Sequence, residues 1–446
     1  MASVLEQSLH ELAAIAGEEG LVANPSACAD YSIDGYAPQC VISPRSPEAV
    51  AAALQYAAQR DLAVIPCCNA TMLSTGNPPR RYDIALSLRE MNRVRACEPD
   101  DLTASVEPGV ELNAFLQVLN RHRLWLPLDP PGSARATLGG LVATNRAGPL
   151  RLRYGAPRDM VVGMKIATPA GKVIKTGGRV VKNVAGYDLA KLLIGSYGTL
   201  GVIVEINFKL YPMPARRATC VCRNAGIEAA REFRRKLLNS PIDPMRMALL
   251  DSGGAGMAQP ALDATGFEIW LEFGGSEAVL LRSMKTVQEI SKALGLEACA
   301  IEDRLAEIAW NRISDFSSAL HGQAGQVIVK AALPIGAVED FVVLAREESG
   351  KAGSPLACVC QNGAGIVHVA LLPQEPIASL PELVAQLRKA AIGKGGSLLI
   401  VRCPSEMKKQ IDVWGPPGDD FVLMRKLKEV WDPKGTLSPG RFLGGL

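Results

Sequence analysis

The sequence predicts an α+β protein of two domains, and three observations lead to this prediction. The chain has 446 residues, more than one ordinary compact domain contains. Between residues 43 and 212, short helical and strand patterns alternate and are separated by loops rich in glycine and proline. After residues 212–217 the sequence pattern changes to longer predicted helices that alternate with predicted strands. This pattern is typical of an antiparallel sheet with helices on one face. We therefore expect an N-terminal helical segment over 1–33, a first domain over 34–214 and a second over 215–446.

Local signals define the elements of the first domain. Ser46 is a helix N-cap, Pro47 suits the first turn, and Glu48 lies near the positive end of the helix dipole. Apolar residues then recur at helical spacing. The same kinds of signal predict a strand over 62–65 that ends at Pro66, a helix over 112–119 and a half-buried strand over 204–211.

The second domain shows strands and helices in alternation. Phe267, Ile269, Leu271 and Phe273 alternate with other residues and predict a strand. Further strands are expected over 327–333, 366–371 and 398–401, and a helix over 280–294 that ends near Gly295.

Composition excludes several classes of protein. The net charge is only +3, so no nucleic-acid-binding tail is expected. No apolar run reaches the ~20 residues that a membrane span needs. Glu6, Glu11, Glu18 and Glu19 interrupt the N-terminus, which argues against a signal peptide. The cytoplasm is therefore the expected compartment.

Neither the cysteines nor the histidines form a metal-binding motif. Eleven cysteines, an odd number in a long chain without an export signal, favour free thiols over a disulfide framework. They include the pairs Cys67–Cys68, Cys220/Cys222 and Cys358/Cys360, and none forms the C-x2-C-x2-C run of an iron–sulfur protein. The four histidines are far apart, so no metal site is expected.

A glycine-rich string spans residues 126–148 and reads "LPLDPPGSARATLGGLVATNRAG". Two adjacent glycines, Gly139 and Gly140, let the backbone approach a ligand and leave N–H groups free for anionic oxygen. Thr137 and Asn145 can add side-chain hydrogen bonds. For the glycine pair alone, an ordinary turn between two elements is the alternative.

Basic residues gather just after this string. Eight lysines and arginines lie between residues 151 and 182, against one acid, Asp159. A solvated charged face is one interpretation, and an electropositive surface for a pyrophosphate or an acidic substrate is the other. Neither a G-x-G-x-x-G nor a Walker A motif occurs, so a nicotinamide or nucleoside-triphosphate enzyme is poorly supported.

Three strings together resemble one family. They are "PLDPPGSARATLGGLVATNRAGPLRLRYGAPRDMVVG", "GGRVVKNVAGYDLAKLLIGSYGTLGVIVE" and, near the chain end, "VWDPKGTLSPGRF". Residues 41–214 resemble the FAD-binding domain of the vanillyl-alcohol oxidase/p-cresol methylhydroxylase (PCMH) family, and are most similar to the FAD-binding subunits of bacterial glycolate oxidases. Residues 215–425 share no specific motif with the family and match only in their general pattern of helices and strands.

The resemblance implies a PCMH-type FAD-binding domain followed by an α+β cap, with the flavin ring between them. It implies oxidation of small 2-hydroxy acids such as glycolate or D-lactate, by hydride transfer to the flavin. A sister flavoprotein subunit and an iron–sulfur subunit are the implied partners, and they can bring the chain to the inner membrane. The residues expected to bind FAD are Pro66, Cys67, Cys68, Asn69, Ala70, Thr71, Pro130, Thr137, Leu138, Gly139, Gly140, Ala143, Thr144, Asn145, Gly148, Tyr154, Gly155, Gly201, Val202 and Ile203.

Two departures from the family pattern stand out. Cys68, Asn69 and Ala70 occupy positions where the family's pyrophosphate loop has glycines, and each brings a Cβ atom toward the phosphates. The clustered histidines of many relatives are also missing, since residues 359–365 read "VCQNGAG" and His368 stands alone. The sequence therefore identifies no residue as the catalytic base. Some relatives attach FAD covalently through a histidine of the pyrophosphate loop. Because no histidine lies between His10 and His122 here, FAD is expected to be held non-covalently unless a cysteine attaches it.

These departures keep two alternatives open. The chain can be a non-catalytic subunit that scaffolds such a complex with a degenerate flavin site. It can also be a stand-alone flavoenzyme that acts on another alcohol, an interpretation that rests on the shared FAD domain alone.

Overall fold

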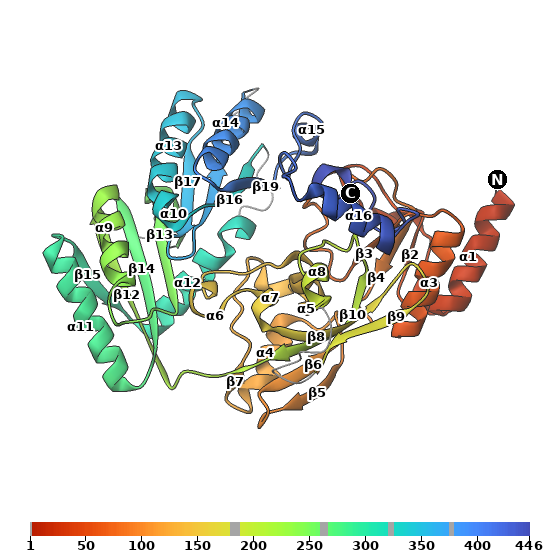
Figure 1. Cartoon of the computed structure of the whole chain (residues 1–446), viewed down its shortest axis with the longest axis horizontal. Coiled ribbons are helices and arrows are strands. Elements are labelled where there is room, and N and C mark those ends of the chain that lie inside the picture. Colours follow the sequence, from red (N-terminus) through yellow and green to blue (C-terminus); the bar gives the residue numbers. More distant parts are fainter. Residues whose placement is uncertain (1, 179–187, 259–265, 320–324, 374–378) are drawn as a thin grey trace.

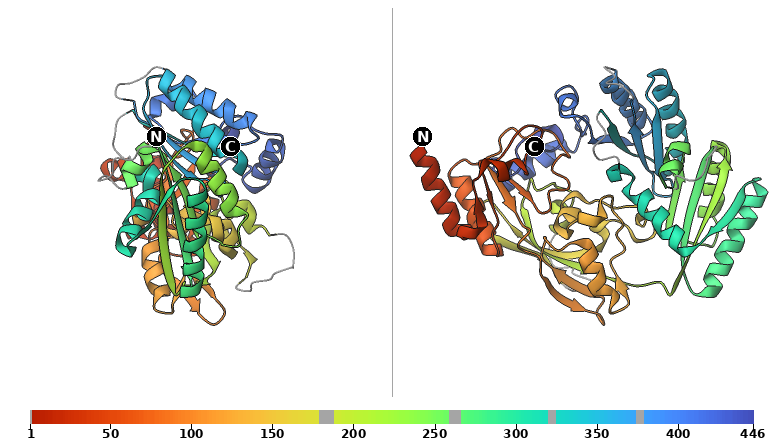
Figure 2. Two further views of the ribbon diagram at one scale, coloured as in Figure 1. Left: turned by 90° about the vertical axis from the view of Figure 1, so that its left-hand side faces the viewer. Right: turned by 180° about the vertical axis from the view of Figure 1, so that it is seen from behind.

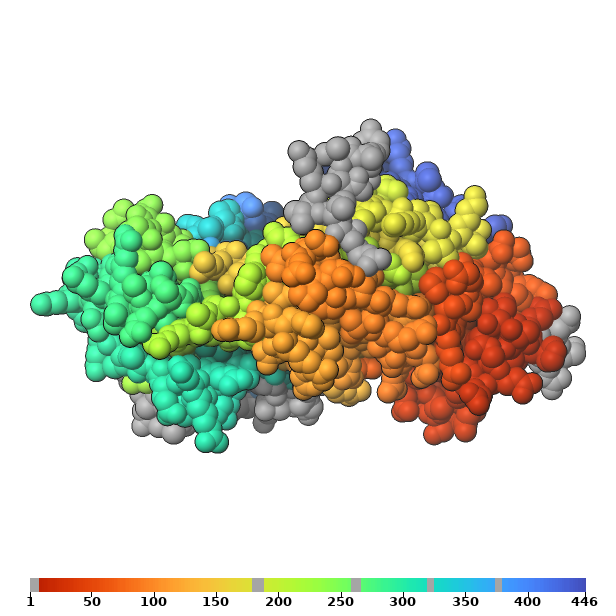
Figure 3. Space-filling model, turned by 90° about the horizontal axis from the view of Figure 1, so that it is seen from below, coloured from red at the N-terminus to blue at the C-terminus, as the bar shows by residue number. Residues whose placement is uncertain are grey.

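The computed structural model describes residues 2–178, 188–258, 266–319, 325–373 and 379–446. The string over 179–187, with Arg179 and Lys182 of the basic cluster, lies outside these ranges. Seen from below, the first residues of the chain (red), the rest of the N-terminal half (orange and yellow) and the cap (green and teal) follow one another along the long axis (Figure 3). We propose that the boundary between the N-terminal half and the cap lies at 212–217, where β11 (Tyr211–Pro212) gives way to β12 (Arg216–Ala225).

The N-terminal half contains two sheets. The four-stranded sheet has the order β1-β2-β4-β3, with β2, β4 and β3 parallel. Helices α1 and α3 cover it and enclose a common apolar core. Its elements are α1 (Ala2–Ala16), β1 (Leu21–Val22), α2 (Pro25–Ala29), β2 (Cys40–Ile42), α3 (Pro47–Gln59), β3 (Val64–Cys67) and β4 (Ile84–Ser87).

The five-stranded antiparallel sheet has the order β5-β6-β10-β8-β9. Helices α4 and α5 pack into its core, and β7 pairs with β11 at one side. Its elements are β5 (Val94–Glu98), β6 (Thr103–Val106), α4 (Leu112–Asn120), β7 (Leu124–Trp125), α5 (Leu138–Thr144), α6 (Arg151–Tyr154), α7 (Pro157–Met160), β8 (Val161–Ala167), β9 (Val173–Gly177), α8 (Ala190–Leu193) and β10 (Val202–Lys209).

The predicted start of α3 is confirmed, because the Ser46 hydroxyl accepts a hydrogen bond from the Ala49 N–H at 3.1 Å. The predicted end of the next strand at Pro66 is wrong. Pro66 lies inside β3 and pairs with Leu86 of β4. Because β3 is an edge strand of its sheet, a residue without an N–H is tolerated there.

The cap is an eight-stranded antiparallel sheet with the order β15-β12-β14-β13-β17-β18-β16-β19. The strands that follow β12 are β13 (Arg246–Leu250), β14 (Phe267–Gly275), β15 (Glu297–Ile301), β16 (Val327–Ala332), β17 (Leu356–Gln361), β18 (Ile366–Leu371) and β19 (Ser397–Arg402). The helices are α9 (Ile227–Leu238), α10 (Ser252–Ala258), α11 (Glu277–Ala293), α12 (Asp303–Ala319), α13 (Val338–Lys351) and α14 (Leu380–Gly393).

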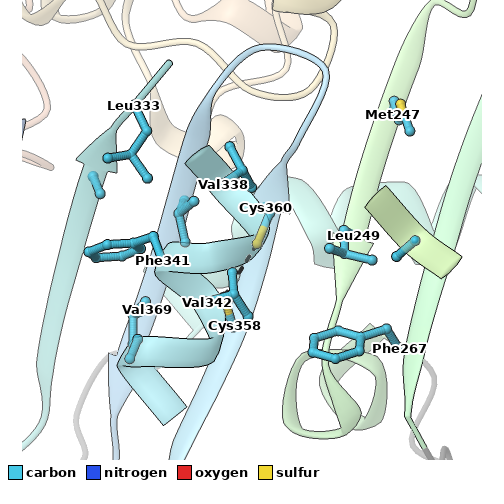
Figure 4. Packing of buried hydrophobic residues seen from close by; sticks show 14 of the residues in the cluster. Met247, Leu249, Phe267, Leu333, Val338, Phe341, Val342, Cys358, Cys360 and Val369 are labelled. Atoms are coloured by element: carbon cyan, nitrogen blue, oxygen red, sulfur yellow. Dashed lines mark hydrogen bonds between the residues drawn. The ribbon is translucent and has the colours of Figure 1, made fainter. Parts of the chain in front are cut away.

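Both faces of this sheet are covered, whereas the sequence predicted cover on one face. Helices α9, α11, α13 and α14 bury one face, and α10 and α12 bury the other (Figure 1). β14 is accordingly buried at all but its last residue. Figure 4 shows Cys358 and Cys360 of β17 beside Val338 and Val342 of α13, with the two sulfur atoms 3.4 Å apart. The contact with Cys360, and then burial, raise the pKa of the Cys358 thiol, so the pair behaves as buried apolar side chains.

The end of the chain returns from the cap to the N-terminal half (Figures 1 and 2). It contains α15 (Ser405–Lys408) and α16 (Phe421–Trp431). Leu437 forms a parallel bridge with Val64 of β3, whose N–H donates to the Thr436 carbonyl at 2.7 Å. The Lys428 ammonium donates to the carbonyls of Thr199 and Leu437 and to the Asp432 carboxylate, all at 2.7–2.8 Å. The closing "DPKGTLSPGRF" element therefore completes the edge of the first sheet.

Candidate functional site

A cavity opens in the N-terminal half between four segments of the chain. These are the loop after β3, helix α5, the segment 196–203 and the C-terminal return at Ser438 and Arg441. The space free of protein atoms is about 920 Å³, its open mouth included. Of the residues predicted to bind the cofactor, Pro66, Cys67, Cys68, Asn69, Ala70, Thr71, Thr137, Gly139, Gly140, Ala143, Thr144, Gly201, Val202 and Ile203 line it.

The loop after β3 presents unused hydrogen-bond donors to this cavity. Within the described residues, the backbone N–H groups of Asn69, Ala70 and Thr71 donate to no acceptor. The Asn69 side chain is turned to other partners, since its amide donates to Glu111 at 2.8 Å and to the Arg135 carbonyl at 3.1 Å. Free N–H groups on a concave turn suit an anionic ligand such as a pyrophosphate.

The two glycines of α5 have different tasks. A Cβ atom on Gly139 would lie 2.5 Å from the Pro108 Cβ and 2.9 Å from the Pro108 oxygen, so this position is closed to other residues by packing. A Cβ atom on Gly140 would meet only the Thr137 hydroxyl, at 3.2 Å, and the Gly140 N–H has no backbone acceptor in the described chain. Gly140 is therefore the glycine that keeps the cavity open.

The residues of the loop after β3, where the sequence departs from the family pattern, are not equally strained. Ala70 has φ of +57°, a left-handed conformation that favours glycine. Cys68 is not among the described residues with positive φ, and its buried thiol contacts the Pro108 carbonyl at 3.6 Å. Burial raises the pKa of Cys68 to about 11. Of Cys68 and Ala70, only Ala70 is therefore expected to strain the loop.

This difference gives a prediction that separates the two positions. Ala70→Gly is expected to raise the free energy of unfolding by up to about 1 kcal/mol, because the left-handed strain is relieved. Cys68→Gly is expected to lower it by roughly 1–2 kcal/mol, because a buried side chain is lost. Chemical denaturation of the two variants and the wild type checks this, and equal effects at both positions would contradict it.

Sequence reasoning missed several residues of the cavity wall. Ser196, Tyr197 and Gly198 lie in a string that carried the resemblance, and Ser438 and Arg441 lie in the closing element. The Arg441 guanidinium donates to the carbonyls of Leu73 at 2.5 Å and Thr75 at 2.6 Å, and so holds the loop after β3. Burial lowers the pKa of Arg441 to about 10. The signal was present in the motif "SPGR", but its contacts depend on the return of the chain end.

Six predicted residues lie outside the cavity lining and have evident packing roles. Asn145 ends α5 with φ of +49° and accepts the Arg158 N–H at 3.1 Å. The ring of Tyr154 packs edge-on against those of Trp125 and Tyr211. Pro130 and Leu138 are buried, a Cβ on Gly148 would overlap the Asp129 oxygen, and one on Gly155 would overlap the Asp159 side chain. Their part in binding a cofactor stays a prediction.

The basic cluster contains surface ion pairs and one partly buried residue, Arg151. Lys165 pairs with Glu205 at 2.8 Å and Arg153 with Asp243 at 3.5 Å, both at partly exposed positions. Burial lowers the pKa of Arg151, and no carboxylate of the described chain lies within 4 Å of it. Most of the cluster is thus the solvated face that the sequence left open as an alternative.

An ionic network joins the N-terminal half to the cap. Asp129, from the loop after β7, accepts the Leu150 N–H at 3.0 Å and the Ser314 hydroxyl of α12 at 3.3 Å. Arg246 of β13 lies 3.7 Å from Asp129 and 2.9 Å from Glu272 of β14, and all three are largely buried. Burial raises the pKa of Asp129 to about 6, and the charge of Arg246 opposes this rise. The Asp129-Pro-Pro-Gly motif therefore anchors the cap.

His368 is buried on β18. Burial lowers its pKa to about 3, and the charges of Lys330, Arg146 and Arg151 act in the same direction. Among the described residues, no three His, Cys, Asp or Glu side chains are placed to hold a metal ion. Within the same ranges, no helix is both long enough and apolar enough to cross a bilayer.

The fold and the cavity define an FAD-linked oxidase. The family model of the FAD binding domain matches residues 38–177. The model of the C-terminal domain of FAD linked oxidases matches residues 213–400 and 407–442, which is half of the chain. The chain therefore belongs to the FAD-linked oxidases, and the cofactor of the family is FAD. The predicted resemblance is confirmed.

Its relatives include enzymes that act on 2-hydroxy acids. The glycolate oxidase subunit GlcD of Bacillus subtilis is 26% identical over 426 residues, which cover 91% of this chain and 89% of that protein. The D-lactate dehydrogenase of Archaeoglobus fulgidus is 27% identical over 420 residues, covering 90% and 91%. The chain is thus an FAD-linked oxidoreductase related to glycolate oxidase subunits and D-lactate dehydrogenases.

Solved structures of low sequence identity share the fold. A substrate-bound p-cresol methylhydroxylase superposes with a TM-score of 0.77 at 16% identity, covering 99% of this chain and 97% of that one. A 4-ethylphenol oxidase from Gulosibacter chungangensis gives a TM-score of 0.78 at 15% identity, with the same coverage. The predicted two-domain PCMH-type fold is therefore confirmed.

Proposed function

We propose that this chain binds FAD non-covalently in the cavity behind β3 and oxidises a short 2-hydroxy acid such as glycolate or D-lactate. The observation that carries the proposal is the set of free N–H groups at Asn69, Ala70, Thr71 and Gly140, all of which are residues that line the cavity. These donors fit the two anionic phosphates of FAD. The substrate class is supported by the relatives that oxidise glycolate and D-lactate.

The chain's own residues have three tasks in this proposal. The loop after β3 and Gly140 bind the pyrophosphate, and Arg441 holds that loop in place through the Leu73 and Thr75 carbonyls. The network of Asp129, Arg246 and Glu272 fixes the cap over the N-terminal half. Bound FAD supplies the acceptor for the two electrons that leave the substrate carbon.

The first test is the absorbance spectrum of the purified protein. The chain is expected to be yellow, and acid is expected to release the flavin. Anaerobic addition of D-lactate or glycolate is expected to bleach the flavin band, whereas 1,2-propanediol, which lacks the carboxylate, leaves it unchanged. Colourless protein that takes up no FAD at micromolar concentration would overturn the proposal.

We further propose that the chain works in a complex with a sister flavoprotein subunit and an iron–sulfur subunit. The support is the similarity to GlcD, which is named as a subunit of glycolate oxidase. In this proposal the complex lies in the cytoplasm and meets the inner membrane through its partners. Co-expression is expected to give a complex that purifies together and turns over faster with a dye acceptor than this chain alone. Robust turnover by the isolated chain would contradict a requirement for partners.

A further inference from the structure

A group of partly buried cations lies where the N-terminal half meets the cap. Arg146 follows α5, Arg151 is the first residue of α6, and Lys330 comes from β16 of the cap. Burial lowers the pKa of Lys330 to about 8, and the charges of Arg151 and then Arg146 lower it further. Burial also lowers the pKa values of Arg146 and Arg151. The three side chains are therefore close enough to act on one another.

Strand register places the polar groups of the cap on one face of its sheet. Lys330 pairs directly with His368, which pairs on its other side with Val359. Gln361 lies two residues beyond Val359 and so points to the same face as His368. Its amide oxygen is buried without a hydrogen-bond partner in the described chain. This is the face that α12 covers with Trp310, Ile313 and Phe316.

Two contacts connect this group with the cofactor cavity. The Arg146 guanidinium donates to the Ser317 hydroxyl at the end of α12, at 3.1 Å, and also contacts the sulfur of Met72, a cavity-lining residue. A Cβ on Gly363, in the turn between β17 and β18, would lie 2.9 Å from Leu152, the neighbour of Arg151. The cations therefore occupy the junction of the two halves, beside the cavity.

The charges around this junction do not balance. In the described chain, no carboxylate lies within 4 Å of Arg146, Arg151 or Lys330. Asp315 acts on Arg146 from a longer distance and already accepts the Gly132 N–H at 2.6 Å. The charge of Asp159 acts on Arg151, also from more than 4 Å away, but Asp159 is exposed and accepts the Ala156 N–H. Three cations against two distant acids leave one positive charge unbalanced, and removing such a charge from solvent, even in part, is costly without a partner.

We propose that Arg146, Arg151 and Lys330 form a binding site for the carboxylate of the substrate, built jointly by the two halves. This inference rests on the proposed function and names the residues that would select an acid over a neutral alcohol. His368 lies beside Lys330 as a neutral imidazole, and the amide of Gln361 offers a further polar contact. One carboxylate supplies the missing negative charge and accepts charge-assisted hydrogen bonds from both halves.

Anion binding tests this site independently of turnover. The probe is oxalate, a short carboxylate with no hydrogen to lose, added to the FAD-loaded chain and to the flavin-free chain. Oxalate is expected to raise the melting temperature of both forms and to shift the flavin spectrum of the first. Lys330→Met and Arg151→Gln are each expected to weaken oxalate binding about 10- to 100-fold, the effect of removing one charged hydrogen bond. Arg153→Gln, two residues away on α6 and paired at the surface with Asp243, is the matched control and is expected to bind like the wild type.

Lys330→Arg is the second variant, which keeps the proposal testable if Lys330→Met does not fold. It keeps the charge and is expected to bind oxalate at pH 7 like the wild type, and to keep binding at pH 9, where the wild type loses affinity as Lys330 loses its proton. Folded Lys330→Met with wild-type oxalate affinity would overturn the proposal, and so would loss of FAD affinity in step with oxalate affinity, which would assign the cations to the cofactor. If oxalate binds as expected but neither glycolate nor D-lactate bleaches the flavin, the anion site stands and the proposed function fails.

Discussion

Gly140→Leu is expected to weaken FAD binding at least about 100-fold, because the new side chain fills the cavity that the glycine keeps open. A methyl group alone would meet only the Thr137 hydroxyl, at 3.2 Å, so the backbone of α5 can keep its place while the longer side chain enters the cavity. The measurement is titration of the flavin-free variant with FAD, followed by protein fluorescence. Because the added volume lies in solvent-filled space, the fold is expected to survive.

Gly393→Leu is the matched control for this experiment. Gly393 is exposed at the end of α14, has ordinary φ, and a Cβ atom there would meet nothing within 4 Å. Wild-type FAD affinity in Gly140→Leu would show that the cofactor lies elsewhere. The same variant separates a redox subunit from a scaffold. If the proposed complex assembles with Gly140→Leu but loses activity, this chain's flavin takes part in electron transfer; full activity would leave it a structural role.

Arg246→Met is expected to lower the free energy of unfolding by about 3–5 kcal/mol at pH 7, since it leaves Asp129 and Glu272 buried without their shared cation. Asp129 already has a raised pKa of about 6, and loss of Arg246 removes the charge that opposes the rise. A carboxyl whose folded pKa is raised costs stability above that pKa, and protonation removes the cost. The deficit relative to the wild type should therefore shrink as the pH falls from 8 to 5.

Arg216→Met provides the comparison for this prediction. Arg216 pairs with Glu277 at 3.0 Å, but both side chains are about two-thirds exposed. Such a pair contributes about 1 kcal/mol or less, so the variant should denature close to the wild type at every pH. Equal losses in the two variants would show that the network at Asp129 adds nothing beyond a surface ion pair.

Much of the fold could be predicted because its signals are local. The Ser46 cap, the apolar stripe of α4 and the alternation of β14 each depend on a few neighbouring residues. The second covered face of the cap sheet could not, because alternation alone does not show that α10 and α12 fold back over the other side. Pro66 was misplaced for a similar reason, since only the sheet order reveals that β3 is an edge strand.

The site residues also differ in how far they could be predicted, because some lie in local motifs and others depend on long-range contacts. The loop after β3 and the Gly139–Gly140 pair stand in strings with specific patterns, and the structure brings them to one cavity. Which glycine packs on Pro108 and which faces the cavity depends on contacts about 30 residues away in sequence. Lys330 and His368 escaped notice as a pair because their partnership comes from strand pairing, and Arg146 joins them from the other half of the chain.

The return of the chain end to β3 also has a consequence for biosynthesis. Thr436 and Ser438 hydrogen-bond to Val64, and Arg441 holds the loop beside it from 368 positions further along the chain, so the cavity is completed only when these residues have been synthesised. Contacts this distant in sequence form late, because a long loop must close first. The nascent chain therefore carries an open edge at β3 until residues 436–438 have been synthesised. A chain truncated before Thr436 would contain both sheets of the N-terminal half and the cap sheet, but its cofactor site would lack this wall.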